Sequence, residues 1–288
     1  MGLLISVIIP VYNDHTGLIT TLTTLTNQTL PESDYEIIVG NDGGSPAIRN
    51  ICNDFGVICV DIIPNRGSYH ARNQAMRKVN SKNFAFVDAD ISVPPNWLEN
   101  GLNALQEADY VAGDVIIQKT KKMSLAELFE YYSAFKIQDY LTEHHFGVTG
   151  NLFVKGRIFT AVGEFDQRLR SSGDLEFGDR VYRHSKFVQK YSSDITVLHP
   201  PRGFRNYSRK IKRGAVGQVM LKEYYPDRFP HINPGYGKAI IRSIVPPIAW
   251  LKKMMVYEKI HIAFLLFIFR WYVNIMKGFY TVRTLLKR

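Results

Sequence analysis

The chain has 288 residues, 45% of them hydrophobic, a formal net charge of +10 and only two cysteines. This composition excludes a disordered chain and fits either one large domain or one domain with an appendage. The charge is uneven, because residues 200–288 hold 18 Lys and Arg against 3 Asp and Glu. A basic, aromatic-rich tail indicates an anionic partner, either acidic lipid or nucleic acid.

Two features predict a cytosolic protein. The segment Met1–Ile9 is apolar but lacks a basic leader and breaks at Pro10, which is typical of a buried strand rather than of a signal peptide. Cys52 and Cys59 show no metal-type spacing and have no further cysteine partners. We therefore expect reduced structural thiols.

The first 115 residues alternate between strand-like and helix-like segments. Strands are expected at 5–10, 35–40, 57–63, 84–87 and 110–115, and the helices between them at about 14–28, ending near 55, 69–79 and 95–107. This succession predicts an α/β fold with a mostly parallel sheet and helices on both faces. In such sheets, ligands bind beyond the carboxyl ends of the strands.

Polar side chains gather at those strand ends. They are Tyr12, Asn13 and Asp14 after the first strand, Asp42 after the second, and Asp88 and Asp90 after the fourth. Residues i and i+2 of an extended segment point to the same side. Asp88 and Asp90 can therefore both face a divalent cation, or one of them can face a cation and the other a ligand hydroxyl. The alternative is a strand end followed by a solvated acidic turn.

The middle of the chain continues the alternation. Residues 124–145 predict one long helix whose aromatic stripe faces a core, with a sugar-stacking or membrane-facing surface as the alternative. Shorter elements follow: a strand at 148–154, helices at 155–162 and 175–184, and a strand at 195–198 that ends at His199.

Residues 201–288 are expected to form a basic helical appendage to a domain of residues 1–200. Their apolar stretch 260–276 is interrupted by polar and charged residues. Its longest uninterrupted run, 262–269, is far shorter than the about 20 residues of a spanning helix. The flanking Lys and Arg favour helices that lie in a membrane interface, and a helical appendage packed on the body is the alternative.

Eight short motifs occur in a fixed order. They are Pro10-Val11-Tyr12-Asn13-Asp14, Val39-Gly40-Asn41-Asp42-Gly43-Gly44-Ser45, Asn65-Arg66-Gly67, Ala71-Arg72-Asn73, Asp88-Ala89-Asp90, Gly150-Asn151, Gly163-Glu164-Phe165-Asp166 and Gly173-Asp174-Leu175-Glu176. The series resembles family-two glycosyltransferases, which have the GT-A fold, use nucleotide-sugar donors and invert the anomeric centre. The resemblance covers about residues 4–200 and implies an enzyme of this kind.

The resemblance also assigns the donor side of a site. The nucleotide-sugar-binding residues that it implies are Pro10, Val11, Tyr12, Asn13, Asp14, Asp42, Arg72 and Asp88. Within this set, Asp42 is expected to contact the base, Arg72 the ribose, base or phosphate, and Asp88 the nucleotide side. Asp90 resembles the ligand of Mn²⁺ or Mg²⁺, and His199 either completes the metal site or is a structural histidine.

Asp174 resembles the catalytic base of the family. A sugar hydroxyl is a poor nucleophile, so its proton must be removed as the new bond forms. The residue before Asp174 is Gly173, whereas the commonest family pattern has Glu there. Glu176 therefore remains a rival base, and a helix N-cap role is the non-catalytic explanation for Asp174.

The resemblance implies transfer of one sugar from a nucleotide-diphosphate donor, with a UDP-sugar as the expected donor. The acceptor is expected to be a glycan or lipid-linked hydroxyl in the synthesis of cell-surface polysaccharide, lipopolysaccharide or glycolipid. The protein is expected on the cytoplasmic face of the cell membrane. Processive relatives carry Gln-x-x-Arg-Trp, but here Phe267 stands where Gln is required before Arg270 and Trp271. We therefore expect no polymerisation.

Other functions fit less well. A dinucleotide-binding oxidoreductase needs Gly-x-Gly-x-x-Gly after its first strand, and a P-loop enzyme needs Gly-x-x-x-x-Gly-Lys followed by Ser or Thr; neither occurs. A non-catalytic domain of the same fold that binds anionic membrane or nucleic acid through its tail is the main alternative. The acids at the strand ends would repel nucleic acid, so we expect no nucleic-acid partner.

Overall fold

A computed structural model describes residues 3–230, 232, 241 and 244–287. The chain divides into two compact units. The first comprises Met1–Ile116 and Phe135–Pro200, and the second comprises Ile117–Ala134 and Pro201–Arg288. The division predicted from the sequence places residues 117–134 in the first domain, whereas their contacts group them with the tail.

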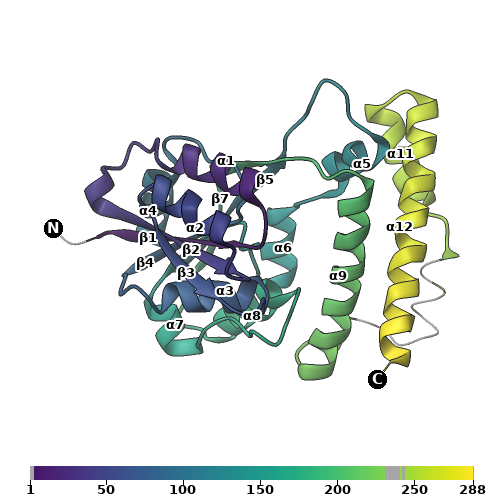
Figure 1. Cartoon of the computed structure of the whole chain (residues 1–288). Coiled ribbons are helices and arrows are strands. Elements are labelled where there is room, and N and C mark those ends of the chain that lie inside the picture. The colour runs from purple at the N-terminus through teal and green to yellow at the C-terminus, as the bar shows by residue number, and fades with distance from the viewer. Residues whose placement is uncertain (1–2, 231, 233–240, 242–243, 288) are drawn as a thin grey trace. The chain divides into compact units, whose positions relative to one another are not determined.

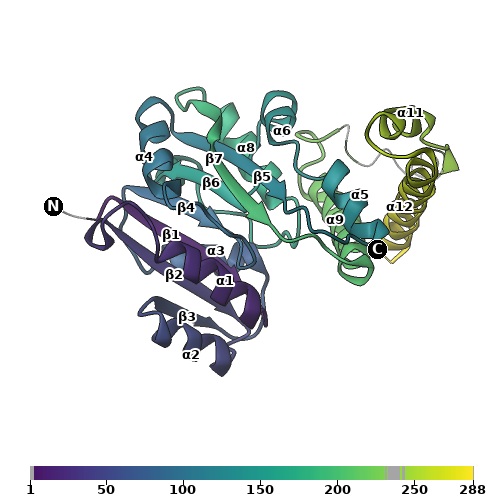
Figure 2. The same ribbon diagram turned by 90° about the horizontal axis from the view of Figure 1, so that it is seen from above.

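The first unit is built on a seven-stranded sheet in the order β3-β2-β1-β4-β6-β5-β7 (Figures 1 and 2). The strands are β1 (Ile5–Val11), β2 (Tyr35–Asp42), β3 (Ile58–Ile62), β4 (Asn83–Val87), β5 (Tyr110–Ile117), β6 (Asn151–Lys155) and β7 (Gln189–His199). Strand β1 pairs in parallel with β2 and β4, and β2 pairs in parallel with β3. This parallel half confirms the predicted α/β class.

The second half of the sheet departs from simple alternation. Strand β6 lies between β4 and β5 and is antiparallel to both. Strand β5 follows β4 in the chain, yet it is not its neighbour in the sheet. The insertion brings Asn151 opposite Val87, immediately before the Asp-x-Asp pair.

Helices cover both faces of this sheet, as predicted. They are α1 (His15–Leu25), α2 (Pro46–Asp54), α3 (Ser68–Met76), α4 (Trp97–Glu107), α6 (Ile137–His144), α7 (Arg157–Val162) and α8 (Gly173–Arg183), with a short 3-10 turn η1 (Glu32–Asp34) before β2. Figure 1 shows α1, α2 and α4 on one face and α3, α7 and α8 on the other.

An aromatic cluster fixes α8 under the sheet. Phe165 lies 4.5 Å from Phe177 of α8 and 5.3 Å from Phe86 of β4, measured between ring centroids. Phe86 and Phe177 are fully buried, and each buried aromatic contributes about 1.5–3 kcal/mol of hydrophobic stabilisation. This packing fixes α8, whose first turn carries Asp174, against β4, the strand that ends just before Asp88.

The single helix predicted at 124–145 is wrong. The chain forms α5 (Leu125–Ser133), which starts with a capping box between Ser124 and Glu127, and then α6. Phe135 breaks the helix, because its φ of 50° lies in the left-handed region. Only Phe129 among the predicted aromatic stripe is fully buried, and it lies in the second unit.

The described residues of the second unit form α5, α9 (Phe204–Tyr224), α11 (Ile248–Tyr257) and α12 (Ile260–Leu286). Its core gathers apolar side chains from all four helices, including Phe129, Ile211, Met254 and Phe269. The predicted tail helix is confirmed as α9.

The expectation that the last apolar stretch is far too short to span a membrane is wrong. Helix α12 runs without a break for 27 residues, and its best 18-residue window has a mean hydropathy of 1.4. Length and composition therefore suit a membrane crossing, although 28% of that window is buried against the rest of the protein. The polar residues that interrupt the sequence do not interrupt the helix.

Candidate active site

The loop after β1 presents an exposed aromatic and a helix cap. Tyr12 is 58% exposed, and Asn13 adopts a left-handed φ of 53°. The carboxylate of Asp14 accepts a hydrogen bond of 2.9 Å from the backbone N–H of Gly17, so Asp14 is the N-cap of α1. Pro10 and Val11 are buried within β1. Only the second half of the predicted nucleotide-lining segment is therefore accessible.

Asp42, at the end of β2, holds the neighbouring loop. Its carboxylate accepts hydrogen bonds from the Asn65 side-chain amide at 2.8 Å and from the backbone N–H groups of Arg66 and Gly67 at 2.7 and 2.8 Å. Only 3% of Asp42 is exposed. These bonds fix the Asn-x-Gly loop over the strand end. They explain an acid at this position without a ligand, and contact with a base stays a prediction.

Arg72 and Asp88 form an ion pair at the end of β4. The Arg72 Nη2 donates to Asp88 Oδ1 at 2.5 Å. The arginine side chain is 2% exposed and that of Asp88 is 41% exposed, so the acid reaches solvent while the cation stays beneath it. In the part of the chain that the structure describes, Arg72 Nε is buried without a hydrogen-bond partner. An unsatisfied buried donor indicates a site that a water or a ligand oxygen completes.

Gly150 stands against the same acid. A Cβ added at Gly150 would lie 3.4 Å from Asp88 Oδ2. Asn151 is fully buried and bonded to the Trp97 indole and to the carbonyl groups of Asp114 and Ile195. It holds strands together rather than facing a ligand.

Asp90 and His199 lie together, as predicted. The distance from His199 Nε2 to Asp90 Oδ2 is 3.5 Å. His199 is buried, and its Nδ1 donates to the carbonyl oxygen of Pro200 at 2.5 Å. A carbonyl oxygen can only accept, so Nδ1 carries a proton, and this bond orients the ring so that Nε2 faces Asp90.

This pair fits a divalent cation only in part. A carboxylate oxygen and an imidazole nitrogen are suitable ligands, and the nitrogen favours Mn²⁺ over Mg²⁺, which prefers oxygen. Among the described residues, no group of three or more His, Cys, Asp or Glu is arranged to hold a metal. Any ion bound by Asp90 and His199 must therefore take further ligands from water or from a substrate.

Asp174 lies in the first turn of α8 and contacts α3. Its Oδ1 accepts hydrogen bonds of 3.1 Å from the Tyr69 hydroxyl and from the Leu175 backbone N–H. Burial raises the pKa of this carboxyl above its usual range, and the Tyr69 bond and the nearby Arg72 charge oppose that rise. Ser172, not Asp174, occupies the N-cap position of α8, and the Leu175 bond is the only first-turn backbone contact with another residue that the structure gives the Asp174 carboxylate among the described residues.

Glu176, the rival base, is occupied elsewhere. Its side chain is fully buried, and both carboxylate oxygens pair with Arg180, at 2.8 Å from Nε and 2.9 Å from Nη2. Arg180 also donates to the carbonyl oxygens of Val162 and Glu164. The pair ties α8 to the preceding turn, which favours Asp174 as the base.

Tyr69 is the site residue that the sequence analysis missed. It hydrogen-bonds Asp174, and the Arg72 guanidinium lies 5.7 Å from its ring centroid. Its ring also explains Gly173, because a Cβ there would lie 2.6 Å from Tyr69 Cε2. Gly173 stands where the commonest family pattern has Glu, and the ring of Tyr69, from the first turn of α3, occupies the space that a side chain there would need.

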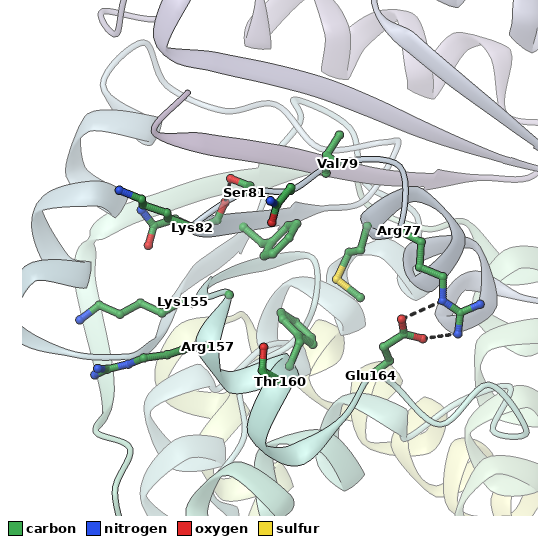
Figure 3. Close-up of a pocket in the computed structure, with 14 residues that line it drawn as sticks. Arg77, Val79, Ser81, Lys82, Lys155, Arg157, Thr160 and Glu164 are labelled. Carbon is green, nitrogen blue, oxygen red and sulfur yellow. Dashed lines mark hydrogen bonds and ion pairs between the residues drawn. The ribbon is translucent and has the colours of Figure 1, made fainter. Parts of the chain in front are cut away.

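A pocket of about 630 Å³ lies elsewhere on the first unit (Figure 3). It is lined by the end of α3, the start of β4, the end of β6 and α7. Asn83, which lines it, opens β4, whereas Asp88 follows the end of that strand. None of the predicted site residues lines this pocket, so it is distinct from the candidate active site.

Comparison with known proteins identifies relatives over most of the chain. Residues 6–163 match the sequence profile of "Glycosyl transferase family 2". Glycosyltransferase AglE of Haloferax volcanii is 29% identical over 224 residues, which cover 75% of this chain and 73% of that protein. Validoxylamine A glucosyltransferase of Streptomyces hygroscopicus subsp. limoneus is 31% identical over 286 residues, with 86% of this chain and 59% of that protein covered.

Solved structures share the fold. The mannosyltransferase PcManGT from Pyrobaculum calidifontis, in complex with GDP-Man and Mn²⁺, has a TM-score of 0.61 at 16% identity and covers 96% of this chain and 86% of that one. S. aureus TarS 1–349 in complex with UDP-GlcNAc has a TM-score of 0.57 at 16% identity and covers 81% and 74%. With the family profile matching more than half of its length, this chain belongs to glycosyl transferase family 2 and is a glycosyltransferase of the GT-A fold.

Proposed function

We propose that the protein transfers one sugar from a nucleotide-diphosphate donor, with inversion, to a hydroxyl of a glycan or lipid-linked acceptor. One observation carries the proposal: Asp174, Tyr69, Arg72 and Asp88 form a continuous chain of contacts. The proposed base, Asp174, is thus connected to the nucleotide-side acid, Asp88, through Tyr69 and Arg72. The pathway in view is the synthesis of cell-surface polysaccharide, lipopolysaccharide or glycolipid.

The donor binds along the strand ends. Tyr12 and Asp14 line the nucleotide, Asp42 shapes the loop beside it, and Asp88 accepts a hydrogen bond from a donor hydroxyl while Arg72 holds its charge. The buried Arg72 Nε supplies a further donor for a ligand oxygen. UDP is the proposed nucleotide, supported by the TarS complex with UDP-GlcNAc, whereas PcManGT carries GDP-Man.

Asp90 and His199 are the proposed metal ligands. The fixed tautomer of His199 and the facing Asp90 oxygen suit Mn²⁺, and PcManGT was solved with Mn²⁺. When bound, the ion neutralises negative charge on the leaving diphosphate.

Asp174 acts as the general base. Its carboxylate takes the proton of the acceptor hydroxyl as the oxygen attacks the anomeric carbon from the face opposite the nucleotide. The bond from the anomeric carbon to the phosphate oxygen breaks, and its electron pair leaves with the nucleoside diphosphate. A carboxyl whose pKa is raised by burial is a stronger base than an exposed one, and Tyr69 orients it.

Attachment to the cytoplasmic face of the membrane is the proposed location. Helix α12 combines an exposed apolar face with flanking Lys and Arg. Such helices lie in the interface of anionic membranes.

The test is a panel of UDP- and GDP-sugars, with Mn²⁺, Mg²⁺ or chelator, read by thermal shift and by release of nucleoside diphosphate. A ligand at about 100 times its Kd raises stability by about 2.7 kcal/mol. We expect one sugar nucleotide to stabilise the protein with Mn²⁺ and to be turned over. A protein that neither binds nor hydrolyses any donor, but still binds anionic vesicles, would be a non-catalytic member of the fold.

A further inference from the structure

A second pocket lies within the helical unit, between α9 and α12. Its volume is about 340 Å³, and it is lined by Lys212, Val216, Tyr280, Arg283, Thr284 and Lys287. The first two come from the middle of α9 and the other four from the last two turns of α12. The volume is at the low end of the range of about 300–1,000 Å³ for small-molecule sites.

The charged side chains that line this pocket are all cations. Three cations, Lys212, Arg283 and Lys287, line it, and no Asp or Glu does. Helix α12 contains no acidic residue along its whole length. Within the described residues, none of the three cations has a carboxylate partner. Bringing three like charges together is unfavourable unless an anion joins them.

Two other groups of cations in the described part of the protein include their own acids. Further towards the start of α9, Lys210 and Arg202 share the buried Glu130, at 2.7 and 2.9 Å. In the pocket of Figure 3, Arg77 forms a doubly hydrogen-bonded pair with Glu164. The pocket between α9 and α12 differs from both in lacking a carboxylate.

The helix dipole explains only part of this arrangement. Arg283 and Lys287 lie at the C-terminal end of α12, where cations stabilise the helix. Lys212 lies in the middle of α9, away from either end of that helix. A second reason is needed for a cation of α9 to face those of α12.

Exposed apolar side chains border the pocket. Ile260, Phe264, Ile268, Ile275, Phe279 and Leu286 recur at helical spacing on the outer side of α12, each between 43% and 73% exposed. The opposite side, with Leu266 and Phe269, packs into the core of the unit. Phe279 and Leu286 lie four residues before and three residues after the lining residue Arg283, so all three share one side of the helix. The basic pocket therefore lies at the boundary between an apolar face and water.

We propose that this pocket binds the phosphomonoester headgroup of an anionic phospholipid. The proposal rests on the membrane association in the proposed function and names its partner. A phosphomonoester carries a charge of about −1.5 to −2 at pH 7 and three acceptor oxygens, which matches three cations better than a singly charged diester does. Arginine binds such a group through paired hydrogen bonds. The acyl chains would then meet the apolar face of α12.

The experiment measures binding of the full chain to phosphatidylcholine vesicles that contain either phosphatidic acid or phosphatidylserine, matched in surface charge. The variant K212Q/R283Q/K287Q removes the pocket charges. The matched control K252Q/K253Q/K259Q removes three exposed cations of the same unit that do not line the pocket. No donor or acceptor is present, so the result is independent of transferase activity.

We expect the natural protein and the control variant to bind phosphatidic acid about tenfold more tightly than phosphatidylserine. A tenfold difference in Kd is about the effect of one additional hydrogen bond to a charged group. The pocket variant should bind both lipids equally. No preference in the natural protein, or a preference that persists in the pocket variant, overturns the proposal. Thermal shift with inorganic phosphate distinguishes a lipid headgroup from a soluble phosphate as the occupant. If phosphate stabilises the natural protein but not the pocket variant, and the natural protein shows no lipid preference, the pocket binds a soluble phosphate and the lipid proposal is overturned.

Discussion

Replacing Glu176 by Gln tests whether Glu176 stabilises the fold or acts as the catalytic base. The substitution keeps the shape of the side chain but removes the charge opposite Arg180. Gln retains one acceptor oxygen, so one of the two charge-assisted hydrogen bonds is lost, each worth about 1.5–3 kcal/mol. Glu176 is fully buried, which adds to the cost. Breaking a buried pair outright costs about 3–5 kcal/mol, so we expect a loss of about 2–4 kcal/mol.

The assay is thermal unfolding followed by transfer kinetics. At about 2–4 °C per kcal/mol for a domain of this size, the Tm should fall by about 5–15 °C. Well below that Tm, kcat should stay near the value of the natural protein, because the Glu176 carboxylate is buried and paired rather than presented to an acceptor.

The chain offers a matched control. Arg77 and Glu164 form the same two-bond pair, at 2.8 and 2.6 Å, but on the surface, with side chains 52% and 31% exposed (Figure 3). Glu164→Gln should cost less than about 1 kcal/mol, because solvent screens exposed pairs. A Glu176→Gln protein that keeps its Tm but loses transfer would refute this reasoning and make Glu176 the base.

Four further outcomes are expected. Asp42→Asn removes a carboxylate that accepts three hydrogen bonds, so unfolding in denaturant should show a loss of about 2–4 kcal/mol, and an unchanged midpoint contradicts the structural role of Asp42. Asp174 must be ionised to act, so kcat/KM should fall with decreasing pH, with a midpoint above the usual pKa range of an aspartate. Tyr69→Phe removes a hydrogen bond that lowers the pKa of Asp174, so it should move this midpoint to higher pH. A midpoint that stays in place argues against Asp174 as the base. The same raised pKa makes the folded state bind more protons than the unfolded chain, so this group's contribution to stability falls as pH rises through the raised pKa. His199→Gln and Asp90→Asn should each weaken Mn²⁺-dependent donor binding at least about tenfold, measured by titration with and without chelator, whereas Mn²⁺-independent binding should change little.

The strand ends were predictable because local patterns determine them. Apolar runs that stop at Tyr12, Asp42 and Asp88 mark the carboxyl ends of strands that pair in parallel, and β1, β2 and β4 lie side by side. The Asp90–His199 contact was predictable only through the family resemblance, because 109 positions separate the two residues in the chain.

Other features depend on contacts that no local pattern shows. The break at Phe135 occurs where the chain passes from one unit to the other, and the capped segment before it packs its Phe129 against Phe269 of α12, with ring centroids 5.1 Å apart. Strand β6 enters the sheet between β4 and β5 by tertiary pairing. Tyr69 looked like an ordinary helix residue until α8 was placed beside it. The glycine at 173 was a visible signal, because its missing side chain leaves room for that ring.

The role of Asp174 is tested most directly by Asp174→Asn, with donor affinity and single-turnover transfer measured on the same preparation in Mn²⁺. Loss of a general base costs about 10²–10⁴-fold in rate. We predict a fall of that size in transfer, with donor affinity within about threefold of the natural protein, because the Arg72–Asp88 pair on the donor side is unchanged. Transfer at the natural rate in Asp174→Asn would contradict the account.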